Sequence, residues 1–112
     1  MKFKTKELKG VTVIELNGNV MGGPDATELN EELHKLVSGG KNKVVVDLGD
    51  VKFMNSSGLG MLIRALTTMR NAGGDMKLAR ASEKIESLLI VTKLITVFDH
   101  HESVAKAVDA FK

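Results

Sequence analysis

The sequence predicts a single α/β domain whose mixed, mostly parallel sheet packs against helices. Three observations support this prediction. The 112 residues fit one ordinary domain, a turn links two β-rich runs at the start, and strand-like runs then alternate with helical patterns. Such alternation forms right-handed crossovers that make successive strands parallel. We therefore expect the order ββαβαβαβα in one domain over residues 1–112.

The first two strands are predicted to form a hairpin. Phe3 to Leu8 and Val11 to Leu16 are β-rich runs, and Lys9-Gly10 between them forms a tight turn. Lysines at positions 2, 4 and 6 share one side of the first strand. We interpret them as a solvated face that guards a sheet edge, with a binding patch as the alternative.

A helix is predicted from Pro24 to about Val37, after a turn-rich loop that begins past Gly18. Pro24 suits a first helical turn, and Gly39-Gly40 supplies the stop. The apolar residues at helical spacing, which should face the sheet, are Ala26, Leu29, Leu33, Leu36 and Val37.

The next strand and helix flank the most informative segment. Val44 to Val46 is a β-branched run typical of a central strand covered on both faces, and Asp47 is predicted to close it. Leu48 to Ser56 is predicted to be a connection. A second helix follows and ends at Asn71 to Gly74. Its buried face is expected to contain Leu59, Leu62, Ile63, Leu66 and Met69.

Two further strand and helix pairs are predicted to complete the chain. Asp75 to Arg80 alternates as a strand, and a short helix begins at about Ser82. Leu94 to Phe98 is predicted to be the last strand, and a closing helix begins at about Glu102. The apolar residues that this helix places together are Val104, Ala107, Val108 and Phe111.

Composition and charge exclude several classes of function. Lys and Arg total 16 and Asp and Glu total 14, so the net charge of +2 argues against a general nucleic-acid binder. No export signal is visible, and no run approaches the roughly 18 apolar residues of a membrane span. The absence of cysteine excludes disulfides and thiolate metal sites. We expect a cytoplasmic protein without direct membrane insertion.

Enzymatic functions are poorly supported. His34 lies in the first helix, and His100 and His101 are expected at the exposed start of the last helix, where neighbours point apart and form no metal site. Neither Gly-x-Ser-x-Gly nor a phosphate-loop lysine is present, which leaves Ser56 without an evident base. We therefore predict no enzyme, metal or cofactor, and interpret Ser56 as a substrate.

Two serines and two glycines occur where a strand leads into the second helix. The first N–H groups of a helix lack intrahelical acceptors and carry a partial positive charge that favours anions. An N-cap role for Ser56 or Ser57 would explain one serine. It would not explain Gly58 and Gly60, because each glycine weakens a helix by roughly 0.5–1 kcal/mol relative to alanine. Either another element, or an incoming phosphate, nucleotide or partner protein, approaches this backbone closely.

These residues resemble the STAS-domain family, the anti-sigma-factor antagonists. The resemblance rests on Asp47-Leu48 and on Phe53-Met54-Asn55-Ser56-Ser57-Gly58-Leu59-Gly60, and element order extends it over essentially the whole chain. In that family an anti-sigma factor that is also a serine kinase phosphorylates the first serine of the pair, which implies Ser56 here. The unphosphorylated antagonist binds that partner and frees the sigma factor; the phosphorylated form releases it. A phosphatase is a further implied partner.

Two departures from the family pattern remove negative charge beside Ser56. Asn55 stands where the family usually has Asp, and the loop Gly18 to Met21 lacks acidic residues. Two alternatives therefore stay open. One is a non-phosphorylated STAS subunit of a transport or stress-sensing complex, and the other is a nucleotide-binding module.

The predicted partner surface combines the serine segment, its flanking loop and the exposed side of the second helix. Flexible thioethers of Met21, Met54 and Met61 would suit a partner surface, although core packing is expected for at least one. Arg64 would pair with an acidic partner or phosphate, or be an ordinary solvated arginine. The predicted partner-binding residues are Met21, Gly22, Asn55, Ser56, Ser57, Gly58, Met61 and Arg64.

Overall fold

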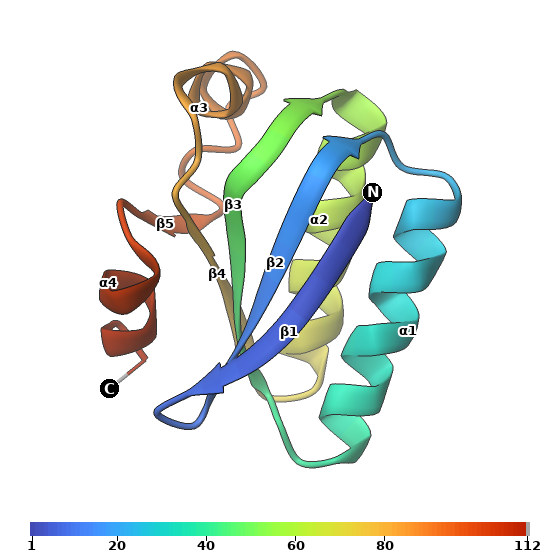
Figure 1. Ribbon diagram of the computed structural model, residues 1–112, viewed down its shortest axis with the longest axis vertical. Coiled ribbons are helices and arrows are strands. Elements are labelled where there is room, and N and C mark those ends of the chain that lie inside the picture. The colour runs from blue at the N-terminus through green and yellow to red at the C-terminus, as the bar shows by residue number, and fades with distance from the viewer. Residues whose placement is uncertain (112) are drawn as a thin grey trace.

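The computed structural model describes residues 1–111 and contains one five-stranded sheet with four helices (Figure 1). The strands lie side by side in the order β1-β2-β3-β4-β5; β1 is antiparallel to β2, and every later pair is parallel. The predicted fold class and element order are confirmed. In chain order the elements are β1 (Lys2–Leu8), β2 (Val11–Val20), α1 (Pro24–Ser38), β3 (Lys43–Met54), α2 (Ser56–Asn71), β4 (Asp75–Ala79), α3 (Glu83–Val91), β5 (Asp99–His101) and α4 (Val104–Asp109).

The sheet has a hydrophobic cluster on each face. Because β2 to β5 follow one another in space as in sequence, right-handed crossovers place α1, α2 and α3 on the same face. Their apolar side chains pack there on residues such as Ile14, Val46 and Leu78. On the opposite face α4 packs on Val13 and Val45 in a smaller cluster. The β-branched run in β3 is thus covered on both faces, as predicted.

β3 is longer than the sequence predicts. It continues past Asp47 to Met54, and Ser56 already belongs to α2, so the predicted connection at residues 48–56 is wrong except at Asn55. Register shifts between β2 and β3 mark two bulges, which bend the second half of β3 (Figure 1). The bulges place Val51 and Met54 in the core three residues apart, which breaks the period of two that identifies a strand. β2 likewise continues to Val20.

The predicted strand at Leu94 to Phe98 is also wrong. Lys93 adopts a left-handed conformation with φ of 62°, and the Leu94 N–H donates to the Leu89 carbonyl at 2.8 Å. This is the hydrogen-bond pattern of a helix end that closes on a left-handed residue. The apolar residues that follow form turns instead of a strand, and Phe98 is buried in the larger cluster.

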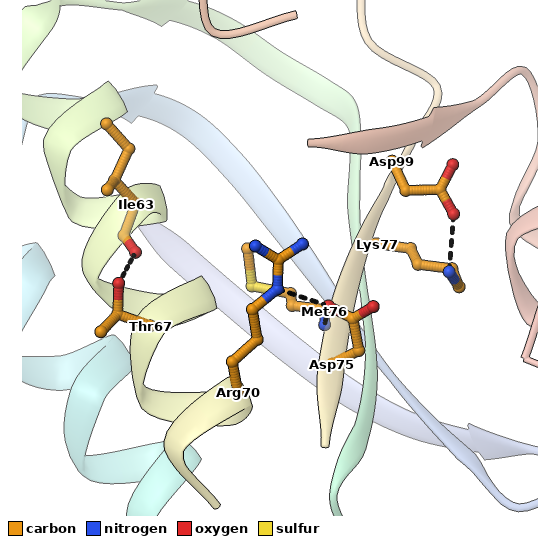
Figure 2. A network of polar contacts seen from close by, with 7 residues as sticks. All are labelled: Ile63, Thr67, Arg70, Asp75, Met76, Lys77 and Asp99. Atoms are coloured by element: carbon orange, nitrogen blue, oxygen red, sulfur yellow. Dashed lines mark hydrogen bonds and ion pairs between the residues drawn. The ribbon is translucent and has the colours of Figure 1, made fainter. Parts of the chain in front are cut away.

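The last strand instead contains the histidine pair. His100 and His101 lie in β5 and are half-buried, so their predicted place at an exposed helix start is wrong. His100 Nε2 lies 3.0 Å from Glu86 Oε1 of α3. Lys77 of β4 also holds the strand, since its Nζ donates to Asp99 Oδ2 at 2.6 Å (Figure 2). Polar side chains therefore fix the three-residue β5 to its neighbours.

Candidate functional site

Two segments that are distant in sequence meet where β2 and β3 end. The Asn55 N–H donates to the Val20 carbonyl at 3.4 Å. A Cβ added to Gly22 would lie 2.9 Å from Ser57 Cβ, so the loop after β2 rests directly on the first turn of α2. In open α/β sheets, ligands are bound outside the carboxyl ends of the strands. The described chain thus brings the predicted loop and serine segment together at such an edge.

Asn55 caps α2. Its backbone is extended (φ −103°, ψ −178°), and its Oδ1 accepts a hydrogen bond from the Gly58 N–H at 2.8 Å. Neither Ser56 nor Ser57 is therefore the N-cap that one interpretation of the sequence assigned to them. An aspartate would cap in the same way, so replacement of the family's usual Asp by Asn preserves the local geometry and removes only the charge.

Ser56 is the first residue of α2 and is exposed, as is Ser57. Among residues 1–111, no side chain or backbone group forms a hydrogen bond with the Ser56 hydroxyl. The adjacent first-turn N–H groups have no intrahelical acceptors, and the helix dipole places a partial positive charge there. The hydroxyl is therefore accessible to another protein, in surroundings that favour an added anion.

The two glycines of this turn have different surroundings. A Cβ on Gly58 would lie 2.0 Å from the Val20 carbonyl oxygen, so close packing against β2 explains this glycine. A Cβ on Gly60 would meet nothing within 4 Å among the described residues. Packing of α2 against β2 therefore accounts for Gly58. At Gly60, by contrast, the helix backbone is not covered by another described element.

The remaining residues of the predicted partner surface divide between surface and interior. Met21 and Arg64 are exposed, and Arg64 borders a groove of about 710 Å³ between α1 and α2. Met61 is only 3% exposed and Met54 is buried, and both belong to the larger core cluster. The three methionines therefore form no shared surface patch, because only Met21 is exposed. Gly22 and Gly58 are buried where the two segments touch.

A separate polar cluster stabilises the bend in β3. The buried Asp47 accepts hydrogen bonds from Arg80 Nε at 2.8 Å and from the Gly49 N–H at 3.0 Å. The hydrogen bond and charge of Asp47 raise the pKa of Arg80 above its ordinary value. A Cβ on Gly49 would overlap the Arg80 guanidinium, so a larger residue there would push this side chain away from Asp47. We assign this pair a structural role, since it compensates a buried carboxylate.

Neither a metal cluster nor a membrane-spanning helix is found in the part of the chain that the structure describes. Residues 1–111 contain no group of three or more His, Asp or Glu side chains arranged to hold a metal ion. His101 Nε2 lies 3.1 Å from Asp99 Oδ1, at an angle that makes no hydrogen bond. Within the same residues, no helix combines the length and apolarity needed to cross a bilayer.

The STAS domain family model matches residues 2–107. The chain belongs to the STAS domain family. The anti-sigma-B factor antagonist of Bacillus subtilis is 31% identical to this STAS domain over 88 residues, which cover 76% of this chain and 80% of that protein. A candidate anti-sigma factor antagonist of Bordetella bronchiseptica, BtrV, is 26% identical over 112 residues, covering 100% of this chain and 96% of the relative.

Solved structures confirm the fold. A candidate anti-sigma factor antagonist from Thermotoga maritima superposes with a TM-score of 0.85 at 23% identity, covering 96% of this chain and 92% of that one. The unphosphorylated form of the antagonist SpoIIAA matches with a TM-score of 0.73 at 16% identity, covering 98% and 97%. The phosphorylated form of SpoIIAA, from Bacillus, has the same TM-score and identity, covering 99% and 100%.

Sequence reasoning missed the exposed apolar surface of this STAS domain. Phe53 is 50% exposed although it lies in β3, two residues before the cap of α2. Phe53 falls within the predicted connection at residues 48–56, and the sequence predicts no role for its side chain. The available signal was the three-residue spacing of Val51 and Met54, which turns the residues between them outward in a bulged strand.

Proposed function

We propose that this STAS domain binds an anti-sigma factor that is also a serine kinase, through Ser56, the loop at residues 20–23 and the exposed side of α2. Phosphorylation of Ser56 then ends the complex, and a phosphatase restores it, in the cytoplasm of a bacterium. The proposal rests on one observation: Asn55 caps α2, so the exposed Ser56 hydroxyl is available to a kinase and not engaged by its own helix. Membership of the family supports an anti-sigma factor as the partner.

The position of Ser56 favours a switch that acts through the interface. A phosphate adds about −1.5 to −2 charge, and the N-terminus of α2 stabilises negative charge, so the domain keeps its fold. A partner that covers Ser56 must instead desolvate the phosphate and oppose any facing carboxylate. SpoIIAA has been solved in both phosphorylated and unphosphorylated forms, which supports the compatibility of this fold with a phosphate.

Intact-mass spectrometry and binding measurements with the purified anti-sigma factor test the proposal. The wild-type chain should gain one phosphate in the presence of kinase and ATP, and Ser56→Ala should gain none. Ser56→Ala should keep its affinity under those conditions, and Ser56→Asp should bind at least tenfold more weakly because it carries a permanent charge.

The neighbouring exposed serine supplies the control. Ser57→Ala should still gain the phosphate, since the modification is assigned to Ser56. Equal affinities for the Ser56→Ala and Ser56→Asp variants would refute the switch. If the protein binds its partner but gains no mass, the alternative holds, and the protein is a non-phosphorylated STAS subunit. This alternative is open because Asn55 stands where the family usually has Asp.

A further inference from the structure

An open apolar groove lies between the second half of β3 and α3. Its volume is about 290 Å³, and its walls include Phe53 from β3 and Leu88 and Val91 from α3. Phe53 is 50% exposed and Val91 is 79% exposed, which makes them two of the most exposed large apolar residues in the described chain. Contiguous exposed apolar surface of this kind is typical of interaction sites.

The topology explains why this groove is open. β4 pairs with β3 only as far as Asp47, so the bent half of β3 has no strand beside it on that side. α3 takes the place of a strand, and its Ile85 and Leu89 point into the core. Its Val91 belongs to a different side of the helix and remains at the surface. The groove therefore results from the bulges in β3 and from the position of α3.

Two lysines give the groove a charge preference. Lys52 and Lys84 line it, and no acidic residue does. Neither lysine forms an ion pair with any residue in the range 1–111. A segment with apolar side chains at its centre and carboxylates beside them would match both features, since complementary charge steers association and fixes register.

We propose that the β3–α3 groove docks an apolar segment of the anti-sigma factor that carries Asp or Glu on its flanks. This inference rests on the proposed function and adds a second contact to it. Only Met54 and Asn55 lie between Phe53 and Ser56, so the two residues are three steps and at most about 11 Å of chain apart, and one partner reaches both places. The groove carries no phosphorylated residue, so its contribution to affinity is independent of the state of Ser56.

Calorimetric titration of the full chain with the purified anti-sigma factor tests the groove. Val91→Ser and Phe53→Ser should each weaken binding about tenfold, and Lys84→Glu should weaken it by a similar factor that shrinks as salt is added. Ile90→Ser is the matched control, because Ile90 is the neighbouring residue of α3, is 61% exposed and does not line the groove. It should bind like the wild type. Thermal melts establish that each variant is folded.

The result separates the groove from the serine switch. With the Val91→Ser change, the ratio of affinities between the Ser56→Ala and Ser56→Asp backgrounds should stay unchanged, because substitutions at sites that share no interacting side chain contribute additively. One outcome would overturn the groove proposal and leave the proposed function intact. In that outcome the wild type binds the anti-sigma factor, Ser56→Asp does not, and all three groove variants keep the wild-type affinity. Absence of wild-type binding would overturn both.

Discussion

At the residue scale, the first turn of α2 shows how one residue type serves two purposes. Gly58 is required by packing, since its Cα lies against the Val20 carbonyl of β2. Gly60 has open space beside it in the described structure. A glycine that weakens its helix without relieving a clash is consistent with a surface where another molecule approaches the backbone.

Alanine substitutions at these two glycines should therefore have opposite effects on stability. Gly58→Ala should lower the free energy of unfolding by about 3 kcal/mol, because a backbone carbonyl 2.0 Å from the new Cβ cannot move without distorting β2. Gly60→Ala should raise it by about 0.5–1 kcal/mol through helix propensity. Urea denaturation of both variants measures the difference, and a loss of stability in Gly60→Ala would show that its surroundings are more crowded than the structure indicates.

The cap residue is testable in the same way. Asn55→Ala should lower the free energy of unfolding by about 1 kcal/mol, because the Gly58 N–H loses its acceptor. Asn55→Asp should keep the cap and raise the free energy of unfolding by about 0.3–1 kcal/mol, because its carboxylate lies at the positive end of the helix dipole. Urea midpoints of the two variants give the comparison. A destabilised Asn55→Asp variant would mean that the amide nitrogen makes a necessary contact of its own.

At the element scale, the helices that cover the larger core end in one shared motif. A left-handed residue follows each helix: Gly40 after α1 (φ 79°), Gly73 after α2 (φ 79°) and Lys93 after α3 (φ 62°). In all three the next N–H donates back to a carbonyl of the last helical turn. The ends of α1 and α2 can be predicted from the sequence, because glycine occupies the left-handed position after each helix. Lysine gives no such signal, so the end of α3 and the turns after it could not be read from residue type.

The contact between Lys77 of β4 and Asp99 of β5 should make the free energy of unfolding depend on pH. The hydrogen bond from Lys77 lowers the pKa of Asp99 from its ordinary value of 3.8; burial opposes this shift and His101 supports it. A carboxyl group whose pKa is lower in the folded state contributes stability above its unfolded pKa. That contribution disappears as the pH falls through the folded value. Asp99 is half-exposed, so the contribution is less than about 1 kcal/mol.

Asp99→Asn should therefore lower the free energy of unfolding slightly at about pH 7, and the difference from wild type should disappear as the pH falls below the ordinary pKa of 3.8 and through the lower folded pKa. Urea unfolding across this range measures the gap. Glu31→Gln, on an exposed face of α1, is the control for the loss of one carboxylate that makes no described ion pair. A gap that stays constant down to the lowest pH would contradict the assigned role of the Lys77–Asp99 contact.

At the scale of the whole molecule, the parallel sheet fixes the site. β2 and β3 end side by side, and each leads into a helix on the same face (Figure 1). The loop before α1 and the start of α2 therefore touch, although about 35 residues separate them. Both follow strands whose apolar residues are buried, so we expect a charge added at Ser56 to act at the surface and not on the core.

The Ser56→Asp variant should accordingly keep the fold while it loses binding. Its free energy of unfolding should equal or exceed that of the wild type, by up to about 1 kcal/mol, because the carboxylate lies at the positive end of α2. Urea denaturation and amide NMR spectra provide the measurement, with Ser57→Asp as the neighbouring control. A loss of more than about 2 kcal/mol would show that the switch acts by unfolding and not through the interface.

Local patterns in the sequence determined the element order, the mixed sheet and the segment that forms the site, because apolar periodicity and glycine stops depend only on neighbouring residues. Contacts with residues distant in the chain decided the rest. Pairing with β2 introduced the bulges that extend β3 and expose Phe53. The Val20 carbonyl required Gly58, and the extended backbone before α2 made Asn55 the cap in place of a serine. Such contacts form only when the sheet assembles, so no local periodicity encodes them.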